Sequence, residues 1–463
     1  MLFKKGENTM ALNTNRMRKK RGGVITRRRF IKTTLAGTAL AGTGGLIFPR
    51  YGAAKPKTLK IMQWIHFVPG FDTWFNETYV KEWGAKNDTE VTVDNIAIAG
   101  LNARARAETL VQKGHDLFLF MVPRPDLEHQ VIDHKEIYDE CIKNLGKPID
   151  LAIRSSYNPK TKKYYGFSDS FVPYPVHYRK DLWDSVGMYP NTWHDVRVGG
   201  AKIRKKHNLS VGIGLASELD SNMAMRAIMY SFGSSVQDEE GNLVLNSKET
   251  LEAIKFVKAM YNECMTPEVF TWDASSNNRF MLTGKGSLTM NAISISRTAE
   301  KDYPEMAMKI WLAKTPKGPV RRMGLQHIMN VYVIWKFAEN IEGAKKFLVD
   351  YVSDFKTAFL ASEFYNFPCF AKTVPDLKKL VAYDKKAQPP DKYKVLEDVL
   401  DWNTNIGYPG HAHAAISETF NAWIISTMFS TAASGKLSPE DALKAADKKV
   451  QAVFKKWRAK GLV

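Results

Sequence analysis

Cysteine is scarce in this sequence, which has three cysteines among 463 residues. Cys141, Cys264 and Cys369 are far apart and odd in number. A small disulfide-stabilised domain has a denser, even-numbered set, and a cysteine-based metal cluster has closely spaced ligands, so both classes are excluded. At most one disulfide can form, and we expect buried free thiols instead.

Long apolar runs and catalytic motifs are missing as well. After residue 54, no stretch reaches the roughly 20 apolar residues that a membrane-spanning helix needs. We find no glycine pattern that would hold a phosphate, and no nucleophile with a base or pair of carboxylates that would indicate a hydrolase. His411 and His413 lack nearby cysteine or carboxylate partners, so we predict no metal site. We therefore expect no cofactor, and these motifs give no indication of hydrolase chemistry.

The excess of basic residues is concentrated at the amino terminus. The formal net charge is +19, but residues 1–54 hold 12 of the 67 Lys and Arg residues and one of the 48 Asp and Glu residues. The rest of the chain therefore has a net charge of +8, and it contains no clustered basic tract. This balance indicates a mildly basic soluble protein and argues against nucleic acid as a partner.

Residues 1–54 have the order of regions that is typical of a secretory signal. Basic residues come first, an apolar run covers residues 35–48, and the small residues Gly52-Ala53-Ala54 follow. The apolar run is too short to cross a bilayer as a helix. No cysteine lies at the expected cleavage site, so we predict a soluble periplasmic protein without a lipid anchor.

An arginine pair within this segment indicates the export route. Arg27 and Arg28 are followed by Arg29 and then by Phe30-Ile31-Lys32. This pattern resembles the twin-arginine export signal, which is an address read by a receptor and not a membrane anchor. The twin-arginine export machinery is therefore an expected partner.

After residue 54, strands alternate with helices. Residues 59–65, 91–97 and 116–122 have the composition of strands, and helical spacing of apolar residues separates them. This order predicts an α/β fold with a parallel sheet. Ligands of such sheets bind beyond the carboxyl ends of the strands, where this sequence places Trp64 and His66.

The length of about 409 residues after Ala54 favours two or three domains. Residues 164–183 contain Pro173 and Pro175, which favour an extended segment. We interpret it as a first crossing between two α/β lobes, although an edge strand within one lobe fits this segment equally well. Residues 316–319, Pro-Lys-Gly-Pro, are interpreted as a second crossing.

Several segments, taken in order, resemble the extracellular solute-binding proteins of ABC importers, in the family that contains the maltose-binding protein. These segments are 82–93, 112–118, 280–291, 316–318, 332–334, 340–348 and 432–443, and the resemblance covers nearly all of residues 57–457. It implies a two-lobed, type II-like periplasmic binding protein fold whose lobes are joined by two or three crossings. It implies a first lobe of residues 55–170 and 317–354 and a second lobe of residues 171–316 and 355–463.

The resemblance also implies a function. A monomer would capture a small-molecule solute between its lobes and deliver it to the permease subunits of an ABC transporter in the membrane, without chemistry on the solute. Two alternatives stay open: an exported enzyme on a similar scaffold that acts on glycans, and a solute sensor for a membrane receptor. Turnover of a ligand would identify the enzyme, and neighbouring permease genes would separate transport from sensing.

Twelve residues form the predicted solute site. They are Trp64, His66, Met121 and Arg124 near strand ends, Tyr174 in the first crossing, Trp272 in a loop of the second lobe, Asn291, Ser294, Gln326 and His327 at positions that face the cleft in relatives, and Tyr408 and His411 before a helix start. For Trp64 and Trp272 the alternative is packing in a core. For Arg124 the alternative to an acidic solute is an ion pair with Asp126.

The predicted site departs from the sugar-binding members of this family. Ser294 stands where those members carry a tryptophan, and Arg124 follows the third strand in place of the family's aromatic and acidic pattern. Carbohydrate is therefore one candidate solute class beside polyols, organic acids and amines.

The arginine pair makes export testable. Changing Arg27 and Arg28 together to Lys should leave the precursor in the cytoplasm, because the twin-arginine receptor reads these two residues. Cell fractionation measures the distribution, and amino-terminal sequencing should place the mature start near Lys55. Normal export of the double variant would contradict this assignment.

Overall fold

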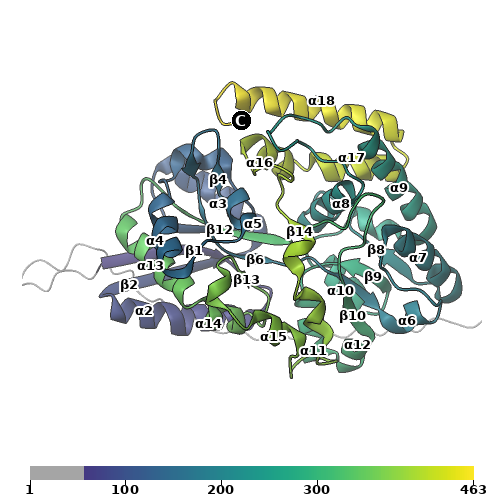
Figure 1. Ribbon diagram of the computed structural model, residues 1–463, viewed down its shortest axis with the longest axis horizontal. Helices are drawn as coiled ribbons and strands as arrows, with labels where there is room; N and C mark the ends of the chain where they lie inside the picture. The colour runs from purple at the N-terminus through teal and green to yellow at the C-terminus, as the bar shows by residue number, and fades with distance from the viewer. Residues whose placement is uncertain (1–56) are drawn as a thin grey trace, which may run out of the picture. The chain divides into compact units, whose positions relative to one another are not determined.

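The structure is a computed structural model that describes residues 57–463 (Figure 1). The predicted export signal, residues 1–54, lies outside the described residues. Within them, no helix combines the length and the apolar character needed to cross a membrane. Cys141, Cys264 and Cys369 are buried and unbonded, which confirms the expectation of free thiols.

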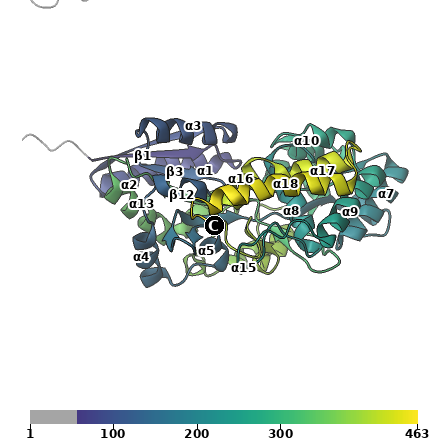
Figure 2. The ribbon, with the colours of Figure 1, turned by 90° about the horizontal axis from the view of Figure 1, so that it is seen from above.

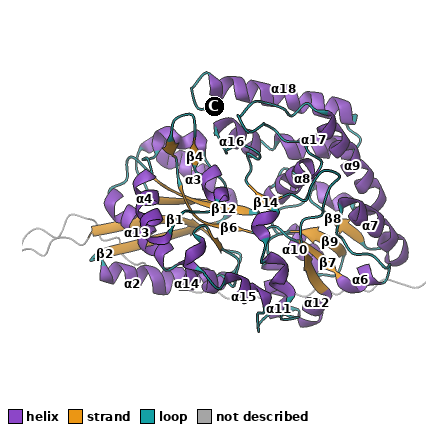
Figure 3. Ribbon diagram, viewed as in Figure 1, coloured by secondary structure: helices purple, strands orange, loops and turns teal. Residues whose placement is uncertain are grey.

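Helices surround two separate sheets (Figure 3). The α-helices are α1 (Pro69–Trp74), α2 (Val80–Lys86), α3 (Ile98–Val111), α4 (Lys135–Leu145), α5 (Asp150–Arg154), α6 (Lys180–Asp184), α7 (Trp193–His207), α8 (Leu219–Ser231), α9 (Lys248–Cys264), α10 (Ser276–Leu282), α11 (Ser294–Asp302), α12 (Pro304–Lys309), α13 (Ile341–Ser353), α14 (Phe355–Ala361), α15 (Leu377–Ala382), α16 (Ala414–Asn421), α17 (Ile424–Ala433) and α18 (Pro439–Arg458). Shorter helical turns are η1 (Phe75–Tyr79), η2 (Pro125–Gln130), η3 (Pro267–Phe270), η4 (Ala371–Thr373), η5 (Lys392–Leu396) and η6 (Val399–Asp401).

The larger sheet has six strands in the order β13-β6-β12-β3-β1-β2. Its strands are β1 (Lys57–Trp64), β2 (Thr89–Ile96), β3 (Leu117–Phe120), β6 (Phe167–Val172), β12 (Ile328–Ile334) and β13 (Phe367–Pro368). β1 pairs in parallel with both β2 and β3, which confirms the three predicted parallel strands. β3 is entirely apolar and buried, as a strand covered on both faces must be.

The smaller sheet has four strands in the order β10-β7-β9-β8. Its strands are β7 (Val176–Arg179), β8 (Ser210–Gly212), β9 (Gly286–Met290) and β10 (Ile310–Ala313). β7 is antiparallel to both neighbours, and β8 pairs in parallel with β9. Two short pairs, β4 (Tyr157–Asn158) with β5 (Lys163–Tyr164) and β11 (Gly324–Leu325) with β14 (Asn403–Thr404), complete the strands of the described chain.

Each sheet has its own hydrophobic core. The first core joins β1, β3 and β12 to the apolar face of α13, where Phe347 and Leu348 are fully buried. The second core joins α8 and α9 to α17 and α18. We call the residues packed around these cores the first lobe and the second lobe. Figure 2 shows the carboxyl end of α18 beside the first lobe, and this end lines a cavity together with α3.

Apart from Ala292, Ile293 and Leu312, which pack in the first core although their chain neighbours pack in the second, the buried side chains change from one core to the other at three places. The first passage runs from Val172 to Tyr174, inside the predicted segment 164–183. The second runs from Leu325 to Ile328 and the third from Trp402 to Ile406. β11 pairs with β14 where the second and third passages lie side by side.

The sequence places the second crossing at residues 316–319, and we propose that it lies several residues later, between Leu325 and Ile328. Gly318 lies so close to the second lobe that an added Cβ would be 2.4 Å from the carbonyl oxygen of Ser231. The backbone N–H of Val320 donates to the same oxygen at 3.2 Å. These contacts hold the chain against the end of α8 before it crosses.

The sequence placed residues 355–463 together in the second lobe. In the structure, buried side chains between Phe355 and Trp402 pack in the first core, and those from Ile406 onward pack in the second. We therefore propose a lobe boundary near residue 402.

Candidate functional site

Buried aromatic and polar side chains of both lobes meet between the two sheets. We call this group the interlobe cluster: Trp64, His66, Tyr174, Asp220, His327 and Tyr365. Trp64, His66 and Tyr365 belong to the first lobe, whereas Tyr174 and Asp220 belong to the second. His327 lies in the second passage. All six are buried.

The first-lobe half of the cluster is a stack of rings at the carboxyl end of β1. The indole Nε1 of Trp64 donates to Asn330 at 3.3 Å, and its ring stacks on His66 with centroids 4.7 Å apart. The ring of His66 meets the ring of Tyr365 at 4.8 Å.

His66 is held as a neutral imidazole. Its Nδ1 accepts the backbone N–H of Val68 at 2.9 Å, which leaves Nε2 to donate to the side-chain oxygen of Asn366 at 3.3 Å. Burial lowers the pKa of His66 to about 4, against partial compensation by these hydrogen bonds. The ring therefore offers an uncharged aromatic face at neutral pH.

The second-lobe half is built at the start of α8. The carboxylate of Asp220 lies 2.9 Å from Nε2 of His327, and the hydroxyl of Tyr174 donates to the backbone oxygen of Asp220 at 3.1 Å. Tyr174 also stacks on His327, with centroids 5.1 Å apart and planes 14° apart. These contacts join the first and second passages to α8.

Glu218 caps this helix. Its carboxyl group accepts the backbone N–H groups of Asp220 and Ser221. Burial and then the charge of Asp220 raise the pKa of Glu218 to about 8, so most of this carboxyl is protonated at neutral pH.

Several buried polar atoms beside the cluster have no hydrogen-bond partner in residues 57–463. They are both side-chain polar atoms of Gln326, Nδ1 of His327, Oδ1 of Asn222, the hydroxyl of Tyr365, Oγ1 of Thr419, and Nε and Nη2 of Arg226. Leaving a buried polar group unpaired is costly. These atoms are therefore candidates for contacts with a bound polar molecule.

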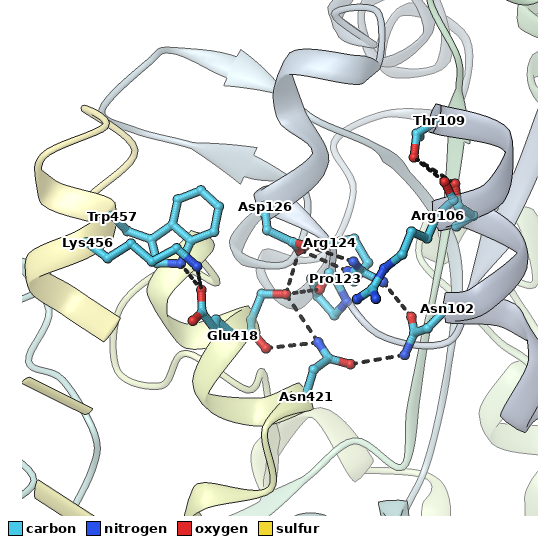
Figure 4. A network of polar contacts seen from close by, with 12 residues as sticks. Asn102, Arg106, Thr109, Pro123, Arg124, Asp126, Glu418, Asn421, Lys456 and Trp457 are labelled. Atoms are coloured by element: carbon cyan, nitrogen blue, oxygen red, sulfur yellow. Dashed lines mark hydrogen bonds and ion pairs between the residues drawn. The ribbon is translucent and has the colours of Figure 1, made fainter. Parts of the chain in front are cut away.

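Cavities lie between the lobes on two sides. One, of about 450 Å³, is lined by residues 67–70 of the first lobe and by residues 297–302, largely on α11. The other, of about 520 Å³, lies between α3 and η2 on one side and α16 and α18 on the other (Figure 4).

Arg124 lines the second cavity, where its guanidinium forms an ion pair with the carboxylate of Asp126. Nε and Nη2 of Arg124 donate to the two carboxylate oxygens of Asp126 at 2.9 and 2.8 Å. Burial raises the pKa of Asp126, but the hydrogen bond and charge of Arg124 outweigh it and hold this pKa below its usual range. Figure 4 shows Arg124 also reaching Asn102, which contacts Asn421 of α16.

The structure brings Trp64, His66, Tyr174 and His327 into one cluster. Gln326, whose side chain is also buried, directly precedes His327 in the sequence. Met121 packs in the first core, and its backbone oxygen accepts the N–H of Met329 at 2.9 Å.

Asn291 and Ser294 form an amide network with the amino-terminal turn of α10. The side chain of Asn291 donates to Asn277 at 3.1 Å, and Asn278 donates to Ser294 at 3.4 Å. The backbone N–H of Asn291 donates to the oxygen of Pro175 at 3.3 Å, so this network adjoins the first passage.

Trp272 packs with the second core. Its ring contacts Phe280 at 5.2 Å, and an added Cβ at Gly212 would be 2.5 Å from it. The cavity beside Trp272 is lined by residues 268–285 alone, all of the second lobe. Trp272 and Phe280 together cover β8, so the structure does not place Trp272 in the interlobe cluster with Trp64.

Tyr408 and His411 lie in the segment that follows the third passage and ends at α16. Tyr408 packs on Tyr230 at 5.1 Å, and His411 meets Tyr157 of the first lobe at 6.1 Å. The hydroxyl of Tyr165 in the first lobe donates to the backbone oxygen of Ala412 at 2.8 Å. These contacts fasten the segment to both lobes at the side of the cluster.

Asp220, Tyr365 and Asn222 were missed from the sequence. Asp220 lies at a helix start beyond the carboxyl end of β8, in the region that the strand-end rule selects, but a loop separates it from the strand. Tyr365 follows two residues with positive φ, Glu363 and Phe364, and no pattern in the sequence marks it. Among the described residues, no group of three or more His, Cys, Asp and Glu side chains is arranged to hold a metal ion.

Comparisons with known proteins identify relatives of this chain. Residues 139–363 match the family described as Bacterial extracellular solute-binding protein. Over 207 residues the chain is 25% identical to a protein of Brucella abortus (strain 2308) that is described as a binding protein. This match covers 43% of the chain and 50% of that protein, so the chain spans half the length of the curated relatives it matches.

Solved structures share the fold. A sugar transporter from Arthrobacter chlorophenolicus A6 with bound laminaribiose superposes with a TM-score of 0.71 at 15% identity, over 86% of this chain and 99% of that one. The maltose-bound MalE3 of T. maritima has a TM-score of 0.70 at 17% identity, with the same coverage of 86% and 99%. A solute-binding protein from Agrobacterium radiobacter K84 in complex with ribitol has a TM-score of 0.67 at 17% identity, again over 86% and 99%. The predicted α/β periplasmic binding protein fold is thereby confirmed.

The raised pKa of Glu218 makes the stability of the protein depend on pH. A carboxyl whose folded-state pKa is about 8, against 4.5 ordinarily, favours folding while it is protonated, and this contribution is lost as the pH rises from about 4.5 through 8. The free energy of unfolding of Glu218→Gln, relative to that of the natural protein, should therefore be higher at pH 8.5 than at pH 5, by about 1 kcal/mol or more. Thermal unfolding at both pH values measures this gain.

Glu249→Gln, in the first turn of α9, is the matched control and should leave the difference unchanged between the two pH values. A constant difference for Glu218→Gln would contradict the assigned protonation of this carboxyl.

Proposed function

We propose that this chain captures a small solute between its lobes and delivers it to the permease of an ABC importer, because residues 139–363 match the family described as Bacterial extracellular solute-binding protein. We further propose export by the twin-arginine route and a periplasmic location as a soluble monomer.

The observation that carries this proposal is the interlobe cluster. It includes Trp64 at the carboxyl end of β1 and Asp220 in the first turn of α8, and open α/β sheets bind ligands beyond the carboxyl ends of their strands. It combines aromatic faces with polar atoms that lack partners in the described chain. Such a combination suits a solute that has both an apolar face and hydrogen-bonding groups.

Sugars and polyols are the solute classes that the structural neighbours suggest. The three neighbours described above carry laminaribiose, maltose and ribitol. In this chain, the stacked rings of Trp64 and His66 would supply the aromatic face, and Gln326 and Asn222 would supply planar amide groups for hydroxyls. The function is binding without turnover.

The enzyme alternative finds no support in the neighbourhood of His327. Among residues 57–463, no serine or cysteine forms a hydrogen bond with this imidazole, which contacts Asp220 instead. Burial raises the pKa of the Cys369 thiol well above its ordinary value, so this thiol is not an activated nucleophile. Binding is therefore the better assignment.

The three passages give a physical route for closure. Hinge motions are absorbed by a few residues in loops or strand ends, and all three passages between the lobes are of this kind. A solute that contacts both halves of the interlobe cluster favours the closed form by its differential affinity for that form.

A confirmed solute should therefore compact the protein. A thermal-shift screen of sugars, polyols, organic acids and amines would first find a ligand, since saturation at 100 times the dissociation constant stabilises the folded state by about 2.7 kcal/mol. Small-angle scattering should then show a smaller radius of gyration with this ligand than with a compound that gave no thermal shift. An unchanged radius under saturation would contradict closure between the lobes.

A further inference from the structure

Arg226 is a fully buried arginine in the middle of α8, with an exposed fraction of 0%. None of the ion pairs formed among residues 57–463 includes it. Burying a guanidinium without a carboxylate partner is unfavourable, because the charge loses its hydration. A fold retains such a group when it serves a purpose other than stability.

One edge of this guanidinium is without partners. Nη1 donates to the backbone oxygen of Ile406 at 3.3 Å, and the ring of Phe420 lies 5.3 Å from the central carbon. Nε and Nη2 have no partner among the described residues. These two nitrogens share one side of the planar group, and together they can donate two parallel hydrogen bonds.

The same edge holds a carboxylate on other arginines of this chain. Nε and Nη2 of Arg124 donate to the two oxygens of Asp126 at 2.9 and 2.8 Å. Nε and Nη2 of Arg179 donate to the two oxygens of Asp181 at 2.8 and 2.6 Å. The free edge of Arg226 therefore has the geometry of a carboxylate site whose carboxylate does not come from the described chain.

Arg226 is connected to the interlobe cluster through α8. Asn222, one turn earlier, donates to the backbone oxygen of Phe420 at 3.0 Å, so Asn222 and Arg226 lie against the same residue of α16. Asp220, at the start of α8, reaches His327 at 2.9 Å. α8 also packs on β11, which leads directly to Gln326.

We propose that Arg226 receives the carboxylate of the bound solute, which is therefore a small polar acid such as a sugar acid and not a neutral sugar. This inference rests on the proposed function and narrows its solute class. The hydroxyls of such an acid would contact the unpartnered atoms of Asn222 and Gln326, while its carboxylate would lie on the edge of Arg226. A carboxylate fits better than a phosphate because one guanidinium edge matches its single charge and its two oxygens.

Matched pairs of solutes test the inference. Isothermal titration would compare D-glucuronate with D-glucose, D-galacturonate with D-galactose, and D-gluconate with D-glucitol, with inorganic phosphate as a further probe. At least one acid should bind about tenfold or more tightly than its neutral counterpart, since hydrogen bonds to a charged group are the stronger ones. Arg226→Met should remove this preference and raise the melting temperature of the solute-free protein, because a buried unpaired charge is replaced by an apolar side chain of similar length.

Arg197→Met is the matched control, because the same edge of Arg197 is occupied by Glu263, and this variant should bind as the natural protein does. Tighter binding of the neutral members would overturn the inference and leave the proposed function standing. Binding of phosphate alone would also overturn it. If no solute binds and Arg226→Met lowers the melting temperature, the guanidinium is structural, and both the inference and the proposed site fail.

Discussion

The contact between Asp220 and His327 is the interaction on which the arrangement of the site depends. It joins the start of α8 to the second passage at 2.9 Å, and both side chains are buried. In such surroundings a hydrogen bond between polar groups is electrostatically stronger than in water. Tyr174 stacks on the same imidazole and thereby ties the first passage to this contact. These links fix the second-lobe half of the interlobe cluster against the first and second passages.

The arrangement of the lobes in the structure is also costly, because it buries polar atoms that have no partner in the described chain. Arg226, Gln326 and Tyr365 each retain a buried donor or acceptor without a partner in the described chain. A solute that pairs these atoms offsets this cost only in this arrangement, so it shifts the equilibrium toward it. The same unpaired groups that weaken the empty arrangement thus supply its dependence on a solute.

Much of the fold could be predicted from the sequence, because local patterns determine it. The alternation of strands and helices over residues 59–122 identified a parallel sheet, and the strand-end rule then identified Trp64 and His66. The later position that we propose for the second crossing rests on the close contact of Gly318 with Ser231, which depends on tertiary packing and not on a local pattern.

The site was harder to predict than the fold. A tryptophan in a loop has the same sequence signal whether it faces a cleft or covers a strand, so Trp272 was assigned to the site although it packs on Phe280. Asp220 was overlooked because a loop separates it from the end of β8, so the sequence does not mark it as a strand-end residue. The unpartnered edge of Arg226 depends on what surrounds α8 in space, and the sequence carries no information on that.

The central claim is that a solute binds at the interlobe cluster, and Tyr365→Phe tests it most directly. The Tyr365 hydroxyl is buried without a partner among the described residues, and burial and then the charge of Asp220 raise its pKa well above the ordinary value. Removing this hydroxyl should weaken solute binding about threefold to tenfold, the effect of one hydrogen bond, without lowering the melting temperature. Tyr138→Phe removes a hydroxyl that is paired with Ser156 at 2.7 Å, and it should lower the melting temperature and leave the affinity intact. Unchanged affinity in Tyr365→Phe would contradict the proposed site.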